Sequence, residues 1–313
     1  MKKHAMITGA DGFIGRNLVA ELLEQGWQVT AVVRNTEKAR GLLGTHEKLR
    51  LLACDMNHYT DLADRWDLGD VSVLFHLAWA GVSDQSSMEY EIQLNNVKCS
   101  CDLQRAAQKL GIPRLVYAGS IMEFEHQKAL DSGYYQVSLR NTYPVAKTAA
   151  RSLLQIQAAN GGMEYIPVII SNIYGPGENS PRLINTAIRS LLDRKHMSFT
   201  RAEQMYDFIY IRDAVRAIRM AGEQGKNNRL YYIGSKRQMP LKQYLFRMRD
   251  LLAPDMELGL GEIPFKGVSL TFDEFDTQGL YEDFGFTQEY TFEEGVRLTA
   301  EAIQEAFLNK GRV

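Results

Sequence analysis

The chain has 313 residues, 45 % of them hydrophobic, and a formal net charge of −2, a composition typical of a globular protein. This charge balance gives no electrostatic reason to expect nucleic acid or an anionic membrane surface as a partner. No segment reaches the roughly 20 apolar residues that span a bilayer. Three cysteines are too few for a disulfide framework, and no cysteine or histidine spacing predicts a metal site. We expect a cytoplasmic protein.

The first half of the chain alternates β-rich runs with helical patterns. Strands are predicted at His4–Thr8, Gln28–Val33, Leu49–Ala53, Val71–Leu77, Arg114–Ala118 and Tyr165–Ile170. Helices are predicted at Ile14–Gln25, Glu89–Leu110 and Pro144–Ala159. Strands separated by crossover helices indicate an α/β protein with a doubly wound parallel sheet of the Rossmann type.

After Ile170 the alternation stops, beginning with Gly175-Pro176-Gly177. We therefore expect residues 1–170 to form the sheet domain and residues 171–313 to form mainly a smaller α/β lobe. Strand patterns at Asp207–Ile211 and Arg229–Ile233, with a helix at Asp213–Gln224 between them, indicate that segments around 205–235 return to the sheet domain. With no linker visible, we expect both parts to share one core.

A glycine-rich turn joins the first strand to the first helix. It reads Thr8-Gly9-Ala10-Asp11-Gly12-Phe13-Ile14-Gly15. Gly9, Gly12 and Gly15 suit a tight turn, a close approach of the backbone to a pyrophosphate, and close helix–strand packing. The helix that follows points its N–H groups at the phosphates. We therefore predict a dinucleotide site here, with Phe13 and Ile14 among its backbone donors.

Residues at the next strand ends predict the rest of the cofactor site, because ligands bind beyond the carboxyl ends of parallel strands. Arg34 follows the second strand, where an acidic residue would favour NAD. Arg34, with Lys38, therefore favours the 2′-phosphate of NADP, and NAD remains the alternative. The other predicted contacts are Asp55 and Met56 after the third strand, and Leu77, Ala78 and Trp79 after the fourth. His76, at the end of the fourth strand, is interpreted as structural.

A second group of residues predicts proton transfer. Ser120 follows the fifth strand, and Tyr143 and Lys147 stand four apart at the start of a helix, so both lie on one helical face. A nearby ammonium lowers the pKa of a phenol, so we expect Lys147 to activate Tyr143 as an acid/base and to hold the nicotinamide ribose. Ser120 would orient the substrate oxygen.

With these motifs in order, the chain resembles the extended short-chain dehydrogenases/reductases, in the NAD-dependent epimerase/dehydratase family that modifies nucleotide sugars. The segments that carry the resemblance span about two-thirds of the chain and include the glycine turn, His76-Leu77-Ala78, Asn96-Val97, Tyr143 to Lys147, Asn172 to Gly177, and Asp207 to Asp213. The resemblance implies a Ser–Tyr–Lys catalytic set, a C-terminal lobe for a nucleotide sugar, and a homodimer formed through two helices.

Two departures from the family pattern narrow the chemistry. Dehydratases of the family carry acidic residues directly after the catalytic Ser or Thr, whereas here Ile121 and Met122 follow Ser120 and Glu123 comes one place later. Dehydration is therefore disfavoured. Tyr206 replaces an arginine that meets the substrate diphosphate in many relatives.

The substrate contacts must then come from elsewhere. Arg182 and Arg201 are candidates for the diphosphate, and Asn172 matches a position that contacts substrate in the family. The leading hypothesis is hydride transfer at a carbon of a nucleoside diphosphate sugar, at C4, by an epimerase or a 4-keto-sugar reductase. The alternatives are an NADP-dependent carbonyl reductase acting on a non-sugar ketone or aldehyde, and a non-catalytic dinucleotide-binding sensor.

Overall fold

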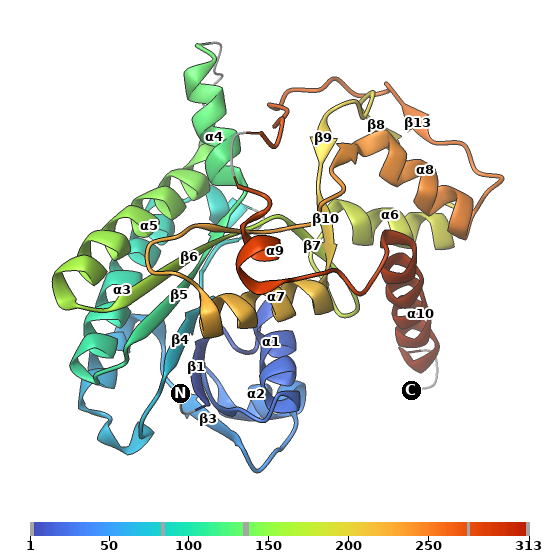
Figure 1. The fold of residues 1–313 in the computed structure, drawn as a ribbon. Coiled ribbons are helices and arrows are strands. Elements are labelled where there is room, and N and C mark those ends of the chain that lie inside the picture. Colours follow the sequence, from blue (N-terminus) through green and yellow to red (C-terminus); the bar gives the residue numbers. More distant parts are fainter. Residues whose placement is uncertain (1–2, 83–84, 134–137, 274–275, 311–313) are drawn as a thin grey trace.

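A seven-stranded parallel sheet organises the molecule (Figure 1). The computed structural model describes residues 3–82, 85–133, 138–273 and 276–310. The strands lie in the order β11-β6-β5-β4-β1-β2-β3 and all neighbours are parallel, which confirms the predicted Rossmann-type sheet. Their bounds are β1 His4–Thr8, β2 Gln28–Val33, β3 Leu49–Ala53, β4 Val73–His76, β5 Arg114–Ser120, β6 Glu164–Ile170 and β11 Tyr231–Ile233.

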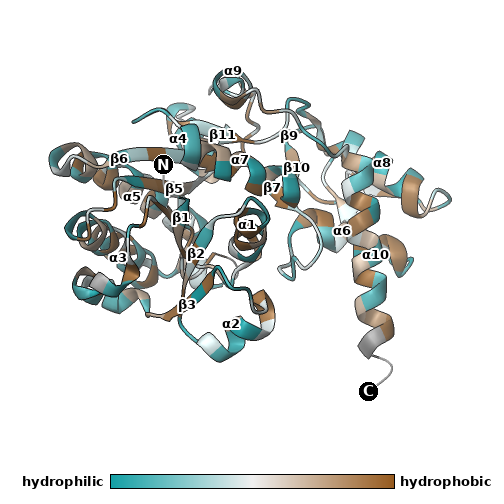
Figure 2. Cartoon of the chain, turned by 60° about the horizontal axis from the view of Figure 1, so that its bottom comes forward, coloured by the Kyte–Doolittle hydropathy of each residue, from teal (hydrophilic) through white to brown (hydrophobic). Residues whose placement is uncertain are grey.

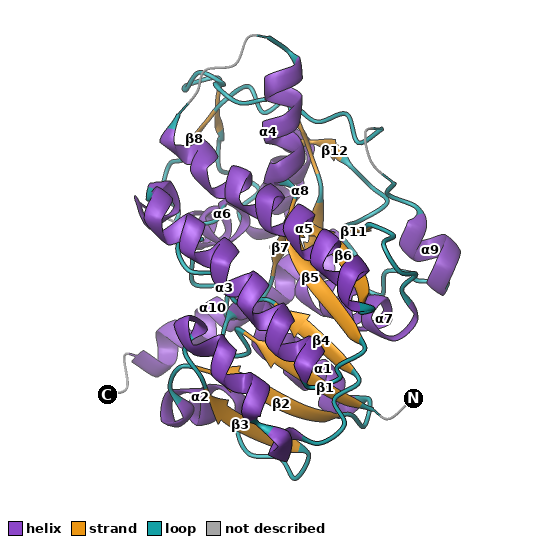
Figure 3. Ribbon diagram, turned by 90° about the vertical axis from the view of Figure 1, so that its left-hand side faces the viewer, coloured by secondary structure: helices purple, strands orange, loops and turns teal. Residues whose placement is uncertain are grey.

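Helices cover both faces of this sheet (Figure 3). The strands alternate accordingly: Ala5 and Ile7 of β1 lie in one hydrophobic cluster, and Met6 lies in the other. Strands buried on both faces are apolar at most positions, and this is why the central strands read as nearly continuous apolar runs. One face carries α1 Phe13–Glu24, α2 Thr36–Leu43 and α7 Ile211–Gln224, and the other carries α3 Tyr90–Lys109 and α5 Thr142–Gly161.

The C-terminal part adds a smaller lobe of helices and short strand pairs beside the sheet (Figure 2). Tyr244 and Val296 of this lobe belong to the same hydrophobic cluster as Ile7 of the sheet, so the two parts share one core, as expected. Its helices are α6 Leu183–Leu192, α8 Leu241–Leu252 and α10 Phe292–Lys310, and its paired strands are β7 Asn172–Tyr174 with β10 Phe208–Tyr210, β9 Met205–Tyr206 with β12 Met239–Pro240, and β8 Ser198–Phe199 with β13 Gly259–Leu260.

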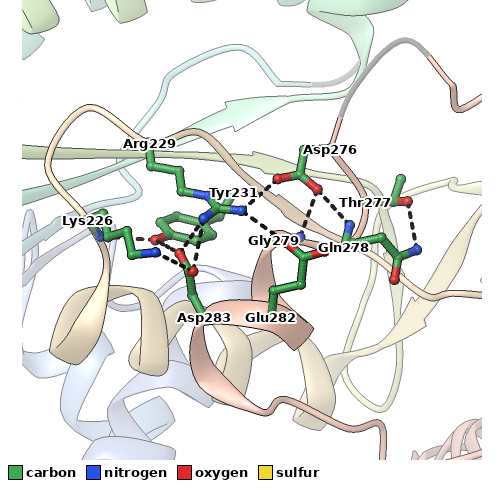
Figure 4. A network of polar contacts seen from close by, with 9 residues as sticks. All are labelled: Lys226, Arg229, Tyr231, Asp276, Thr277, Gln278, Gly279, Glu282 and Asp283. Carbon is green, nitrogen blue, oxygen red and sulfur yellow. Dashed lines mark hydrogen bonds and ion pairs between the residues drawn. The ribbon is translucent and has the colours of Figure 1, made fainter.

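An ionic network covers the sheet at its edge strand β11 (Figure 4). Asp283 of α9 (Gly279–Phe284) accepts hydrogen bonds from the Tyr231 hydroxyl at 2.7 Å and from Lys226 Nζ at 2.6 Å. Arg229 joins Asp283 to Asp276 through ion pairs of 2.8 and 2.9 Å. An open strand edge invites pairing with another chain, and here α9 and these side chains shield it.

Among the described residues of the first half, two α-helices were not predicted from the sequence. Helix α2 has only eight residues, and its signals are local: Asn35 Oδ1 caps the Lys38 N–H at 2.9 Å, and Gly44 ends the helix at a φ of 70°. Helix α4, Met122–Asp131, begins directly after β5. The helix α4 matters for the site, because it brings Glu123 behind Ser120.

Candidate active site

A cleft of about 680 Å³ lies at the carboxyl ends of the parallel strands. It gathers most of the residues that the sequence predicts for a site, although they come from separate segments of the chain. Three of the predicted residues, Lys38, Asn172 and Arg201, lie outside it. Those that line it are Gly9, Gly12, Phe13, Ile14, Gly15, Arg34, Asp55, Met56, Leu77, Ala78, Trp79, Ser120, Tyr143, Lys147 and Arg182.

The glycine turn forms a cradle that side chains would destroy. Gly9 has a φ of +70°, and a Cβ there would lie 2.8 Å from the backbone nitrogen of Ala78. A Cβ on Gly15 would lie 2.1 Å from the carbonyl oxygen of Gly9. The N-terminus of α1 has no side-chain cap and no acidic residue in its first turn. An uncapped helix N-terminus is a ready anion site, so these residues fit the pyrophosphate of a dinucleotide.

The arginine expected to select the cofactor lies at the cleft, without the lysine expected beside it. Arg34 is exposed and lines the cleft where β2 ends. Among the described residues, no hydrogen bond or ion pair engages its guanidinium. Lys38 is exposed on α2, outside the cleft. Asp55 uses its carboxylate to cap the next turn, accepting from the Asn57 N–H at 3.0 Å.

Lys147 is almost fully buried at the centre of the cleft, with 5 % of its surface exposed. Its Nζ donates to the Ala118 carbonyl at 2.9 Å and lies 3.8 Å from the centre of the Trp79 ring. The indole is itself held, because Trp79 Nε1 donates to Gln93 Oε1 at 2.8 Å. Burial lowers the pKa of Lys147 to about 7, and a cation–π contact stabilises its charged form.

Tyr143 does not have the lowered pKa that its neighbour Lys147 led us to expect. Burial raises the pKa of Tyr143 to about 12, while a hydrogen bond with Ser120 and the charge of Arg182 act in the lowering direction. The Lys147 Nζ lies 6.0 Å from the centre of the Tyr143 ring. The expectation was therefore wrong for the polypeptide itself, because desolvation of the phenolate outweighs the nearby charges.

Ser120 stands beside Tyr143 at the end of β5, and a glutamate lies behind it. Glu123 Oε1 accepts the backbone N–H of Ser120 at 2.8 Å, and Glu123 Oε2 lies 2.7 Å from Arg151 Nε. The Glu123 side chain is 1 % exposed, and Glu123 does not line the cleft. The Glu123 carboxylate therefore contacts Ser120 and Arg151 and does not face the cleft.

His76 has the structural role expected of it. Its ring is buried between the Thr8 hydroxyl, 2.7 Å from Nδ1, and the Ser100 hydroxyl, 2.8 Å from Nε2. Burial, with a smaller contribution from the charge of Lys147, lowers the pKa of His76 to about 3. A neutral imidazole with both nitrogens engaged packs β1 and β4 against α3.

The predicted substrate residues are dispersed. Arg182 lines the cleft, while Arg201 lines a second hollow of about 410 Å³ in the smaller lobe. The Asn172 side chain donates to the Asp207 carbonyl at 3.2 Å and thus joins β7 to β10. Tyr206 stacks on Phe208 with ring centres 5.4 Å apart. The structure thus does not bring Arg182 and Arg201 into one pocket.

Sequence reasoning missed several polar residues that line the cleft. Asn57 and Asn95 meet there, with the Asn95 amide donating to Asn57 Oδ1 at 2.9 Å. No sequence motif predicts this pair, because Asn57 follows the third strand and Asn95 belongs to α3. Glu178 and Ser180 line the cleft near Arg182, in the loop before α6. In the described residues no group of three His, Cys, Asp or Glu side chains could hold a metal ion, and no helix there is long and apolar enough to cross a membrane.

With this geometry, the comparisons with known proteins can be interpreted. Residues 5–234 match the NAD dependent epimerase/dehydratase family. The chain belongs to this family. The predicted family is thereby confirmed, and with it the expectation of an enzyme of the short-chain dehydrogenase/reductase superfamily. The family's description names NAD, whereas the expected preference for NADP finds no support in it.

Two relatives and one solved structure are similar to this chain. The chain is 27 % identical to a UDP-N-acetyl-alpha-D-glucosaminuronate decarboxylase of Bacillus cytotoxicus, over 97 % of this chain and 99 % of the relative. It is 26 % identical to a dihydroflavonol 4-reductase of Hordeum vulgare, over 74 % of this chain and 71 % of that one. The solved UDP-N-acetylglucosamine 4-epimerase of Methanobrevibacter ruminantium M1 has the same fold, with a TM-score of 0.81 and 23 % identity over 98 % of this chain and all of the other.

Proposed function

We propose that this protein transfers a hydride between a nicotinamide dinucleotide and C4 of a nucleoside diphosphate sugar. The observation that carries the proposal is that one cleft contains both the glycine cradle and the side chains of Ser120, Tyr143 and Lys147. The cradle fits a pyrophosphate, and the three side chains fit an exchange of a proton with a sugar hydroxyl. The bound nicotinamide supplies the group that accepts and returns the hydride.

In this proposal, each polar residue at the reaction centre has one task. Ser120 donates a hydrogen bond to the oxygen at C4 and orients it toward Tyr143. Tyr143 takes the hydroxyl proton as the alcohol is oxidised, and returns it as the ketone is reduced. Lys147 holds the ribose of the cofactor with its ammonium, which Ala118 and Trp79 keep in place.

Because of the pKa of Tyr143, reduction and oxidation of the substrate require different protonation states of its hydroxyl. With a pKa near 12, Tyr143 carries its proton at neutral pH and is ready to donate it in a reduction. Oxidation requires the phenolate, and therefore additional positive charge beside Tyr143. Arg182 already acts in the lowering direction, so the additional positive charge would come from the oxidised nicotinamide ring.

Three outcomes can follow from the same 4-keto sugar. Reduction on the opposite face gives an epimer, release after one reduction gives a net reductase, and a carboxylate at C5 would be lost as carbon dioxide, because a β-keto acid decarboxylates. Epimerisation and net reduction are the outcomes we propose, and the decarboxylase relative makes the third a required control. The dihydroflavonol reductase relative supports a second candidate, reduction of a non-sugar ketone by the same residues.

A deuterium label distinguishes these outcomes. The protein would be incubated with NAD or NADP and a panel of nucleoside diphosphate sugars that carry deuterium at C4, with products followed by NMR and cofactor by absorbance. An epimerase keeps the label on the sugar and inverts C4, whereas a dehydrogenase moves it to the cofactor. If no sugar is inverted at C4 or passes its C4 label to the cofactor while a non-sugar ketone is reduced, the proposed function is wrong and the second candidate takes its place.

We further propose that two copies of the chain pair through α3 and α5, which lie side by side on one face of the molecule (Figure 3). Large apolar side chains are exposed on both helices: Tyr90 and Leu94 on α3 are each 60 % exposed, and Ile156 on α5 is 59 % exposed. Apolar residues gathered on one face commonly mark an interface. Sedimentation should show a dimer that Leu94→Arg with Ile156→Arg converts to a monomer, and a monomeric parent protein would refute the pairing.

A further inference from the structure

An ion pair with a buried carboxylate lies directly behind Ser120. Glu123, in the first turn of α4, uses one carboxylate oxygen for the Ser120 N–H at 2.8 Å and the other for Arg151 of α5 at 2.7 Å. One carboxylate thereby joins the end of β5 to the helix that carries Tyr143 and Lys147. Space for it depends on Gly119, because a Cβ there would lie 2.6 Å from Glu123 Oε1.

The position of this pair is hard to explain by stability alone. The buried Glu123 carboxylate loses its hydration, while Arg151 is 27 % exposed, and apolar residues in place of a buried ion pair often stabilise a protein as well. Arg151 follows Lys147 by four residues, so both lie on the same face of α5. The pair therefore fixes the face of α5 that meets the end of β5, which is where Ser120 lies.

We propose that Glu123 is a positioning residue of this site, which sets the separation between Ser120 and the Tyr143–Lys147 pair and supplies the negative charge that faces Lys147. The inference rests on the proposed function, because it assigns Glu123 a part in the same proton transfer. It also makes a claim about Lys147 that is independent of the substrate.

The charges around the two reacting side chains support this role. Lys147 is faced by His76 from β4, Tyr117 from β5 and Glu123 from α4. Burial lowers the pKa of Lys147, and the carboxylate of Glu123 raises it. Tyr143 is faced by Ser120, Arg182 and Glu123. In the described part of the chain, Glu123 is the carboxylate that acts on both side chains.

Glu123→Gln tests the proposal by removing the charge while keeping an oxygen for the Ser120 N–H. The titration of Lys147 would be followed by NMR on protein made with isotope-labelled lysine, with Lys147→Met identifying its signal. We expect the midpoint for Lys147 to move to lower pH. We also expect kcat to fall about tenfold or more, with KM within about threefold, because positioning affects the chemical step more than substrate binding.

Two further variants serve as controls for Glu123→Gln. Glu164→Gln removes a more exposed Arg–Glu contact at the opposite end of β5, where Arg114 Nε donates to Glu164 Oε2 at 2.6 Å, and should leave both kcat and the Lys147 midpoint unchanged. Arg151→Lys keeps the cation and should keep the midpoint. If Glu123→Gln behaves as Glu164→Gln does, or if Arg151→Lys lowers the midpoint as much as Glu123→Gln, the proposal is overturned. If the parent protein turns over no sugar, the proposed function fails, and the Lys147 titration still decides the role of Glu123.

Discussion

Replacing Lys147 by methionine should make the folded protein more stable. The Lys147 side chain is buried, and its pKa falls from the usual 10.5 to about 7. Each unit of this pKa difference corresponds to about 1.4 kcal/mol, so burying the ammonium costs up to about 5 kcal/mol below pH 7. Methionine fills similar space without a charge. Losing the hydrogen bond to Ala118 and the contact with Trp79 offsets part of this stabilisation. The free energy of unfolding should therefore rise by about 2 to 4 kcal/mol.

The pH dependence of this gain has a definite sign. Between pH 7 and 10.5 the folded protein binds fewer protons at Lys147 than the unfolded chain does. The parent protein therefore gains stability as the pH rises through this window. Lys147→Met lacks that gain, so the difference between the two proteins should be largest below pH 7 and should narrow toward pH 10.

Urea unfolding followed by circular dichroism at a series of pH values measures both quantities. Lys48→Met, a substitution at an exposed lysine, is the matched control and should change the free energy of unfolding by less than about 0.5 kcal/mol. The reasoning is refuted if Lys147→Met is less stable than the parent below pH 7, or if the difference between them does not change with pH.

Three further perturbations test other parts of the account. Arg34→Ala should weaken NADP binding and leave NAD binding nearly unchanged in calorimetric titrations, and an equal loss of both would make Arg34 a surface residue. Gly15→Ala should abolish cofactor binding because its Cβ would meet the Gly9 carbonyl, while Gly41→Ala, in open space on α2, should bind normally and gain about 0.5–1 kcal/mol of stability. Asp283→Asn should lower the melting temperature at neutral pH. The ion pairs of Asp283 hold its pKa below its usual value. The difference in melting temperature should therefore vanish as the pH falls through the lowered pKa of Asp283. A difference that persists in acid would contradict the ionic account.

The sequence predicted the sheet because its signals are local and strong. Strands buried on both faces read as apolar runs, and the glycine turn locates the first crossover, so β1, β2 and β3 match their predicted bounds. Predicted strand Val71–Leu77 is shorter in the structure, where β4 covers Val73–His76, although the backbone N–H groups of Ser72 and Leu77 still donate to β1. The helices of the smaller lobe were not predicted, although α6 buries Ile184, Ile188 and Leu191 at helical spacing, and their positions depend on packing between distant segments.

The candidate site shows the same contrast between local motifs, which the sequence reveals, and contacts between distant segments, which it does not. Ser120, Tyr143 and Lys147 were found from motifs, since each stands at the end of a strand or the start of a helix. The environment of Lys147 could not be found in this way, because Trp79, Ala118 and Glu123 reach it from three different segments. For the same reason the direction of the Tyr143 pKa was mispredicted, since desolvation is a property of the folded protein.

The most direct test of the account is the turnover of Tyr143→Phe. Phenylalanine keeps the ring that contacts Trp79 and removes the hydroxyl that is proposed to carry the proton. With the sugar found to react at C4, kcat should fall by about 100-fold or more, while the dissociation constant of the cofactor stays within a few-fold of the parent value. If Tyr143→Phe turns over that sugar at a rate within a few-fold of the parent protein, Tyr143 is not the acid/base and the proposed mechanism is wrong.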